Sequence, residues 1–167
     1  MRGVYEPQYQ ILIDNRTYRQ RAGFHVVTPL RIEGSDMRVL VNRGWIPGLA
    51  EHDRVPDVDT PDGTVEVSGQ AVVPSSRFLT LKDERSGGAW PRVWQNLDME
   101  RYAALAGFPV QPVVIQLDPQ SAAGGFVREW PRPDDRRLTN LGYALQWWSF
   151  ATVTVALWLY FGFRRKP

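Results

Sequence analysis

Residues 141–163 constrain this chain more than any other feature, because the run LGYALQWWSFATVTVALWLYFGF contains no charged side chain. A bilayer core of roughly 30 Å is crossed by about 20 helical residues, so the run is long enough to span it. Aromatic residues lie near both of its ends, as at membrane–water interfaces, and Arg164, Arg165 and Lys166 follow it. The alternative is a buried core helix, but such helices rarely stay uncharged over this length. The sequence predicts a transmembrane helix at 141–163 and a short tail at 164–167.

The side of the membrane on which the rest of the chain lies is left open by the charges. Arg132, Arg136 and Arg137 precede the uncharged run, and three further basic residues follow it, so the positive-inside rule gives nearly a tie. The first residues have no apolar run of the kind found in a signal peptide. We therefore expect either a cytosolic domain or a missing N-terminal segment that directs export.

Residues 1–130 show short alternating runs separated by turn residues, which is typical of strands. Asp98 is a suitable N-cap for a helix at 99–106, which Gly107 would end. We predict an α+β fold, a mainly antiparallel β soluble domain at 1–130 with one short helix, joined by a linker at 131–140 to the membrane helix. The expected strands are 9–14, 24–32, 38–46, 64–73, 93–97, 113–117 and 126–130.

Three local features refine the expected strands. Asp14-Asn15 is expected to end the first strand, and Pro29 suggests an edge position or a bulge in the second. The strand at 64–73 alternates almost strictly, which makes Val65, Val67 and Ala71 candidates for its buried face.

Composition argues against several classes of function. Basic and acidic residues nearly balance, at 20 and 18, so nucleic acid is not expected as a partner. The chain has no cysteine, which excludes disulfides, thiolate nucleophiles and iron–sulfur clusters. No serine-hydrolase, zinc-protease or nucleotide-binding motif is present, and the two histidines are His25 and His52. We expect Glu51, His52 and Asp53 to be a solvated loop rather than a metal site, and a binding or assembly role rather than an enzyme.

Three blocks of sequence together resemble the surfeit locus protein 1 family. The first is GFHVVTPL at 23–30, followed after a turn by VLVNRGWIP at 39–47. The second is VWQNLD at 93–98, which leads through a short helix to PVVIQLDP at 112–119. The third is NLGYALQWWSFA at 140–151. The resemblance extends over nearly the whole chain.

The resemblance implies a role in assembling cytochrome c oxidase. In this family two transmembrane helices flank a domain outside the cytoplasm, so a first helix would be missing here. It implies a bacterial inner membrane, a periplasmic domain and a cytoplasmic end at 164–167. We expect a non-enzymatic factor that assists haem a insertion into the catalytic subunit or stabilises that subunit. The alternative is a carrier that binds and delivers haem a, and a weaker one is a periplasmic enzyme. Expected partners are the catalytic subunit, the lipid bilayer and haem a synthesis or other assembly proteins.

The resemblance also bears on haem ligation. The resemblance makes a histidine just before the LGYA block the natural candidate for an axial ligand, and Asn140 holds that position here. An amide is a poor iron ligand in comparison with imidazole. Either another residue such as Tyr143 supplies the ligand, or the protein acts by protein contact alone, which we favour.

Ten residues are candidates for contact with a partner or with haem. Asn42, Arg43, Gly44 and Trp45 are equally consistent with an exposed signature and with a strand end that has Trp45 in the core and Arg43 in a salt bridge. Trp94 and Gln95 are more consistent with a structural role. In the helix, Gln146 favours contact with another helix, with an interfacial position as the alternative. The helix candidates are Asn140, Tyr143, Gln146 and Trp147.

Overall fold

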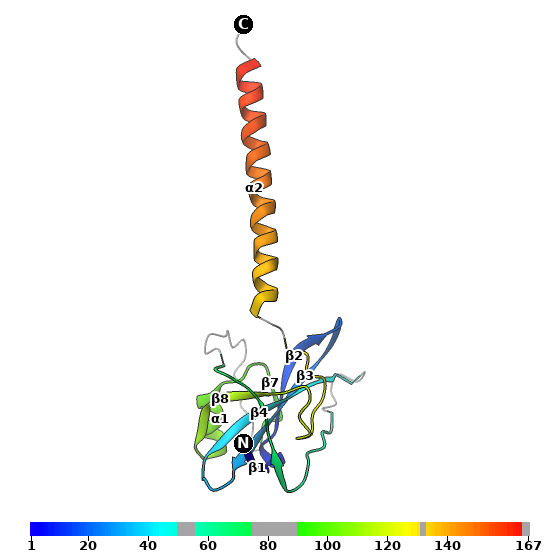
Figure 1. The fold of residues 1–167 in the computed structure, drawn as a ribbon, viewed down its shortest axis with the longest axis vertical. Helices are drawn as coiled ribbons and strands as arrows, with labels where there is room; N and C mark the ends of the chain where they lie inside the picture. The colour runs from blue at the N-terminus through cyan, green and yellow to red at the C-terminus, as the bar shows by residue number, and fades with distance from the viewer. Residues whose placement is uncertain (50–55, 75–89, 131–132, 165–167) are drawn as a thin grey trace. The chain divides into compact units, whose positions relative to one another are not determined.

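The protein consists of two compact units, which the computed structural model describes at residues 1–49, 56–74, 90–130 and 133–164. One unit is Met1–Glu129 and the other is Trp130–Pro167. Figure 1 shows a β-rich body in the first and a single long helix in the second. Each unit is described by itself below.

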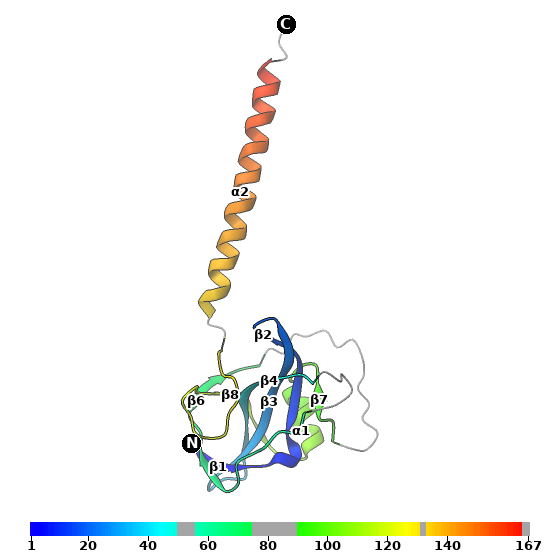
Figure 2. The same cartoon turned by 90° about the vertical axis from the view of Figure 1, so that its right-hand side faces the viewer.

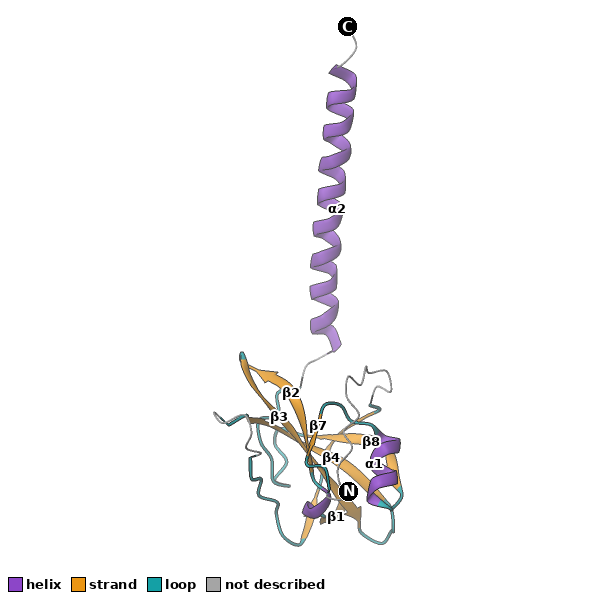
Figure 3. Ribbon diagram, turned by 180° about the vertical axis from the view of Figure 1, so that it is seen from behind, coloured by secondary structure: helices purple, strands orange, loops and turns teal. Residues whose placement is uncertain are grey.

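The β-rich unit contains strands from nearly its whole length and little helix (Figure 3). A 3-10 turn lies at Pro7–Tyr9 and helix α1 at Met99–Ala106. The strands are β1 Arg2–Tyr5, β2 Ile11–Tyr18, β3 Arg21–Ile32, β4 Arg38–Pro47, β5 Thr64–Glu66, β6 Gly69–Val72, β7 Val93–Trp94 and β8 Val110–Leu117.

The strands form one curled, mixed sheet, in which neighbouring strands follow the order β5-β1-β3-β4-β8-β6 (Figure 2). Strand β2 pairs with β3 and with the short β7. Most pairs are antiparallel, as the sequence predicted, but β4–β8 and β2–β7 are parallel. The parallel pairing of β8 follows from the α1 crossover that precedes it, since parallel neighbours require a long connection.

The two ends of this sheet path are joined by one short stretch of chain. Strand β5 pairs with β1 and β6 pairs with β8, and only Val67 and Ser68 separate β5 from β6. The Val67 amide donates to the Met1 carbonyl at 2.7 Å, and the Asp118 amide donates to the Ser68 carbonyl at 2.9 Å. The prediction of a single strand at 64–73 is therefore wrong, because this segment forms the two strands β5 and β6. Val67 is buried and Val65 half-buried, but Ala71 is exposed because the chain bends between the two pairings.

Two of the expected strand features lie elsewhere. Strand β2 continues past Asp14 because Asn15 adopts a φ of 57° and the register shifts between Ile13 and Arg16. The irregularity in β3 lies between Val26 and Val27 rather than at Pro29, which pairs with Leu40. The strand expected at 126–130 is reduced to one isolated bridge between Trp45 and Val127.

Helix α1 confirms the prediction from its end signals. The Asp98 carboxylate accepts from the Arg101 amide at 3.0 Å, and Gly107 ends the helix with a φ of 72°. Tyr102 is fully buried and donates its hydroxyl to the Tyr9 carbonyl at 2.8 Å. These contacts hold α1 against one of the core clusters, which contains Ile11, Ile13, Val27, Leu40, Trp94, Tyr102 and Val114.

The second unit contains helix α2, Pro133–Arg164. A helix over 141–163 is confirmed, and it begins within the segment expected to be a linker. Among the residues that the structure describes, no helix combines the length and the apolar character needed to cross a membrane. The prediction of a membrane-spanning helix is therefore not supported. The run contains Gln146 and hydroxyl residues such as Ser149, which donates to the Leu145 carbonyl at 2.9 Å, and these lower its average apolar character.

Candidate functional site

The motif NRGW at 42–45 forms a β-bulge in β4. Val26 pairs with Gly44 and Val27 with Asn42, which leaves Arg43 as the extra residue. The Gly44 amide donates to the Asn42 side-chain oxygen at 3.2 Å. Gly44 has a φ of 120°, and a Cβ there would lie 2.6 Å from the Val127 carbonyl oxygen. Glycine is therefore required at position 44 by the backbone geometry of the bulge.

Arg43 is buried, with only 1% of its surface exposed, and hydrogen-bonds to four segments that are distant in the sequence. Its guanidinium also lies over the rings of Tyr5 and Phe126, with its Cζ 5.2 and 5.1 Å from the centroids. The acceptors of its hydrogen bonds are the Gly124 carbonyl at 2.9 Å, the Asp59 carbonyl at 2.6 Å, Thr60 Oγ1 at 2.9 Å, Gln10 Oε1 at 3.2 Å and Thr28 Oγ1 at 3.4 Å.

All of these acceptors are neutral oxygens, so Arg43 is not held by a direct hydrogen bond to a carboxylate. Burial lowers the pKa of its guanidinium, with Tyr5 and Asp59 acting in the opposite direction. The structure places Arg43 as a structural link between β4, residues 59–60 and residue 124. It does not present the guanidinium to a partner at the surface.

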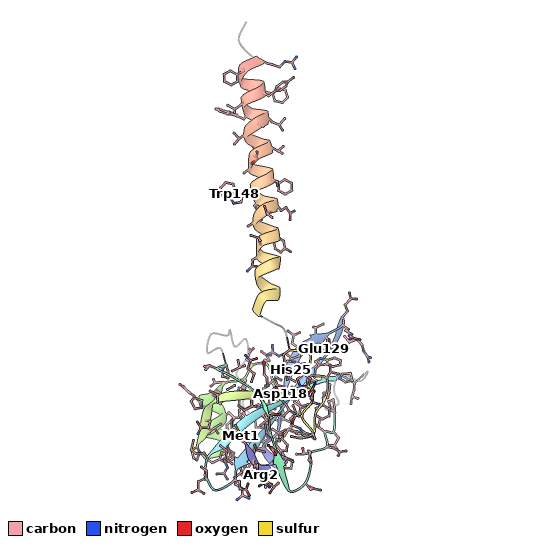
Figure 4. The ribbon with its side chains drawn as sticks, viewed as in Figure 1. Met1, Arg2, His25, Asp118, Glu129 and Trp148 are labelled. Carbon is pink, nitrogen blue, oxygen red and sulfur yellow. The ribbon has the colours of Figure 1, made fainter. Side chains whose placement is uncertain are left out.

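His25 lies beside this bulge, and Figure 4 marks its position. Its Nδ1 is 3.4 Å from the Asn42 amide nitrogen, and it pairs across the sheet with Ile13 and Trp45. Burial and the nearby positive charge of Arg16 lower the pKa of His25 to about 4. The imidazole is therefore neutral at pH 7, with Nδ1 as acceptor and the proton on Nε2.

We expect the β-rich unit to lose about 2 kcal/mol of stability as the pH falls from about 6.5 to 4. The unfolded chain binds a proton on His25 near pH 6.5, whereas the folded chain does so only near pH 4. Between these two pH values protonation of His25 stabilises the unfolded state relative to the folded state. The expected loss of about 2 kcal/mol is reduced because His25 is partly exposed. Urea unfolding of the full chain at several pH values measures the loss. The His25→Gln variant should lose this part of the pH dependence, and an unchanged dependence in that variant would contradict the prediction.

Trp45 connects the bulge to an exposed group of side chains. Its indole donates to the Arg16 carbonyl at 2.7 Å, and its ring centroid lies 5.2 Å from that of Tyr18. The Tyr18 hydroxyl donates to Glu129 at 2.7 Å, and Arg19 pairs with the same carboxylate oxygen at 3.2 Å. We call Tyr18, Arg19, Trp45 and Glu129 the hairpin-tip cluster. Sequence reasoning missed it because Glu129 is distant in the sequence and lies in an expected strand; the YRQR run at 18–21 was the available signal.

The other candidates in the β-rich unit are neighbours with opposite environments. Trp94 is 1% exposed and donates its indole to the Pro91 carbonyl at 2.8 Å, with Arg101 Cζ 4.7 Å from its ring. Gln95 is exposed. The structure therefore gives Trp94 a packing role, as expected, and leaves Gln95 accessible.

The helix candidates Asn140, Tyr143, Gln146 and Trp147 are all exposed on α2. They belong to a different compact unit from the candidates of the β-rich unit. Many apolar side chains on this helix are equally exposed, among them Trp148 at 74%, which Figure 4 labels. The ring of Trp147 contacts that of Phe150, with their centroids 6.3 Å apart.

The described residues do not fit a haem iron site at the expected position. Asn140 is an exposed amide, and residues 131–167 contain no histidine. Tyr143 is 61% exposed. Within the described ranges no group of three or more His, Asp or Glu side chains is placed to hold a metal ion. Glu51, His52 and Asp53 lie outside these ranges.

The relatives described below are named surfeit locus protein 1 or SURF1-like protein. Surfeit locus protein 1 of Mus musculus is 25% identical over 169 residues, which is 99% of this chain and 53% of the relative. A SURF1-like protein of Monosiga brevicollis is 25% identical over 146 residues, covering 87% of this chain and 53% of the relative. Surfeit locus protein 1 of Homo sapiens is 25% identical over 141 residues, covering 83% and 44%. The chain thus spans about half the length of these curated relatives.

The profile of the SURF1 family matches residues 1–152, which include the β-rich unit and the first part of α2. All three sequence blocks at 23–47, 93–119 and 140–151 lie inside this match. Since the match covers far more than half of the chain, the chain belongs to the SURF1 family.

Proposed function

We propose that this protein is a non-enzymatic assembly factor for cytochrome c oxidase that contacts the catalytic subunit while haem a is inserted or the subunit is stabilised. The observation that carries the proposal is the family match over residues 1–152. The buried positions of Arg43 and Trp94 support contact through other, exposed groups. The absence of a suitable iron ligand at Asn140 favours contact with protein over direct haem a transport.

We further propose that the protein works at the bacterial inner membrane, with the β-rich unit in the periplasm. Exposed apolar side chains on α2, such as Trp147, Trp158 and Phe163, support contact with lipid. Apolar surface of this extent on an exposed helix marks an interaction site. The aromatic side chains have the amphipathic form that favours the headgroup region of a bilayer.

Deleting the gene in its own host tests the assembly role. We expect the reduced-minus-oxidised haem a signal and the cytochrome c oxidase activity of membranes to fall together, while b- and c-type cytochromes persist. Restoring the wild-type gene should restore both. Unchanged haem a and activity, in a host with no second copy of the gene, would overturn the proposal. A loss of all cytochromes would indicate a general membrane defect and would overturn it as well.

The alternative of a haem a carrier has its own test. Full-length protein purified after co-expression with haem a synthesis should remain colourless if contact with protein is the mechanism. A stoichiometric haem a spectrum would establish the carrier. Loss of that spectrum in Tyr143→Phe would then identify the ligand.

A further inference from the structure

The end of the β2–β3 hairpin extends beyond the neighbouring strands. Arg16–Tyr18 pair with Arg21–Gly23, whereas β7 reaches only Leu12 and Ile13. Strand β4 reaches β3 as far as Gly23, and the Gly48 amide after it donates to the Ala22 carbonyl at 3.1 Å. Within the described part of the chain only the tip of the hairpin, Tyr18 to Arg21, is therefore a two-stranded ribbon. A two-stranded ribbon has little stability of its own, so its conformation here depends on the side chains that contact it.

The turn that closes this ribbon has two non-glycine residues in the left-handed region, which strains its backbone. Arg19 and Gln20 have φ values of 46° and 64°. Hairpin turns that need a positive φ at both central residues strongly prefer Asn-Gly or Gly-Gly. A side chain in the left-handed region costs about 1 kcal/mol per residue, and such strain concentrates at functional sites. A turn selected for stability alone would not carry Arg19 and Gln20.

The ribbon also carries a concentration of arginine around an aromatic residue. Arg16, Arg19 and Arg21 lie within six residues, and the Arg19 side chain is 73% exposed. Arginine and tyrosine are among the residue types that dominate protein–protein interfaces. Arg19 and Arg21 are exposed, whereas Arg16 is half-buried. The two exposed arginines at the tip fit a partner that carries carboxylates.

The hairpin-tip cluster holds these side chains in a defined arrangement. Tyr18 is fixed from one side by the Trp45 ring at 5.2 Å and from the other by Glu129 at 2.7 Å. Arg19 lies over the Tyr18 ring, with Cζ 5.1 Å from its centroid. An interface that is ordered before binding loses less entropy when the partner arrives. Trp45 of the NRGW motif thus acts indirectly, by supporting the exposed ribbon.

We propose that the β2–β3 hairpin end, residues 16–21, is the surface that docks onto an acidic segment of a partner protein. The inference rests on the proposed function, since the partner it names is the catalytic subunit of the oxidase. A protein is favoured over an anionic lipid surface because the Glu129 carboxylate lies within the cluster. A uniformly anionic surface would repel Glu129, whereas carboxylates on a folded partner can lie opposite single arginines.

The test is co-purification of full-length protein with the affinity-tagged catalytic subunit in detergent. Reversing the charge of Arg19 and Arg21 together (R19E/R21E) should weaken capture by about 10-fold to 100-fold. Capture by the wild type should also weaken at high salt, because exposed ion pairs are screened. The matched control reverses Arg2 and Arg92, which are 63% and 51% exposed in weak ion pairs, and should leave capture unchanged.

A second variant separates charge from folding. Gln20→Gly keeps every charge and removes the steric cost of the positive φ at this position. The variant should therefore retain capture and melt at the same or a higher temperature than the wild type. If R19E/R21E unfolds, the neutral pair R19A/R21A serves in its place, with a smaller loss of capture expected.

The outcomes distinguish the two proposals. If the wild type does not capture the subunit, the proposed function fails and the inference falls with it. If the wild type captures it and R19E/R21E captures it equally well, the inference alone is overturned. It is also overturned if R19E/R21E keeps the subunit but loses binding to phosphatidylglycerol vesicles relative to phosphatidylcholine vesicles, since the hairpin end would then face lipid.

Discussion

Replacing Arg43 with alanine is expected to lower the free energy of unfolding of the β-rich unit by about 3–5 kcal/mol, because five acceptors, two in buried and three in half-buried hydrogen bonds, lose their donor. The side-chain oxygens of Gln10 and Thr28 would lose this partner inside the core, and the carbonyl oxygens of Asp59 and Gly124 would lose it in a half-buried region. Removing the buried charge recovers some desolvation free energy, but not enough to offset these losses. The loss should be measured by hydrogen exchange of the β3 and β4 amides in the full chain.

Two further variants test whether the stability depends on the several hydrogen bonds that the planar guanidinium of Arg43 donates at once. Arg43→Lys keeps the charge but reaches fewer acceptors at once, so it should lose about half as much stability as Arg43→Ala. Arg31 on β3 has a side chain that is 55% exposed, and Arg31→Ala should change stability by less than about 0.5 kcal/mol. A loss below about 1 kcal/mol in Arg43→Ala would contradict the structural role.

Replacing Trp94 with alanine is expected to cost about 3–5 kcal/mol, the range typical of a large aromatic side chain removed from a core. Trp94 is 1% exposed and packs against Tyr102, with ring centroids 6.0 Å apart. The cavity would lie between α1 and the sheet. We therefore expect the amides of α1 to lose protection from hydrogen exchange first.

The neighbouring residue provides the control for Trp94. Gln95 is exposed, so Gln95→Ala should change stability by no more than about 0.5 kcal/mol. In the oxidase assembly assay Trp94→Ala should fail only as far as it unfolds the protein. Loss of assembly by a Trp94→Phe variant with wild-type stability would instead indicate that the indole contacts a partner.

Sequence reasoning succeeded where the determining signals are local. Asp98 and Gly107 bracket α1 within ten residues, and the hairpin of β3 and β4 turns at residues 33–36. It failed where a distant partner decides the conformation. The bend between β5 and β6 exists because β1 and β8 take up successive parts of the same stretch, and no pattern within 64–73 indicates that.

The contrast between local signals and distant partners also explains which parts of the candidate site the sequence could indicate. The family is confirmed by the match over residues 1–152. The motif NRGW was singled out as a candidate contact surface, because an arginine suggests a surface position unless its acceptors are known. Those acceptors come from Gln10, Thr28, residues 59–60 and Gly124. Likewise the role of Trp45 depends on Tyr18 and Glu129, which only the folded hairpin brings together. The uncharged run at 141–163 predicted a membrane-spanning helix; the helix is confirmed, but the span is not supported because the average apolar character of the run was overestimated.

The joining of β5 to β1 and of β6 to β8 also has a consequence for how the chain folds. Residues 69–72 join the sheet only after β8, which ends at Leu117, has been made. Contacts this far apart in sequence carry a high loop-closure cost and slow folding. During synthesis, the hairpin of β3 and β4 can form early, whereas one edge of β4 and one edge of β6 stay unpaired until β8 has emerged. Exposed strand edges in that interval favour wrong pairings, so this protein should depend on chaperones while it is being made.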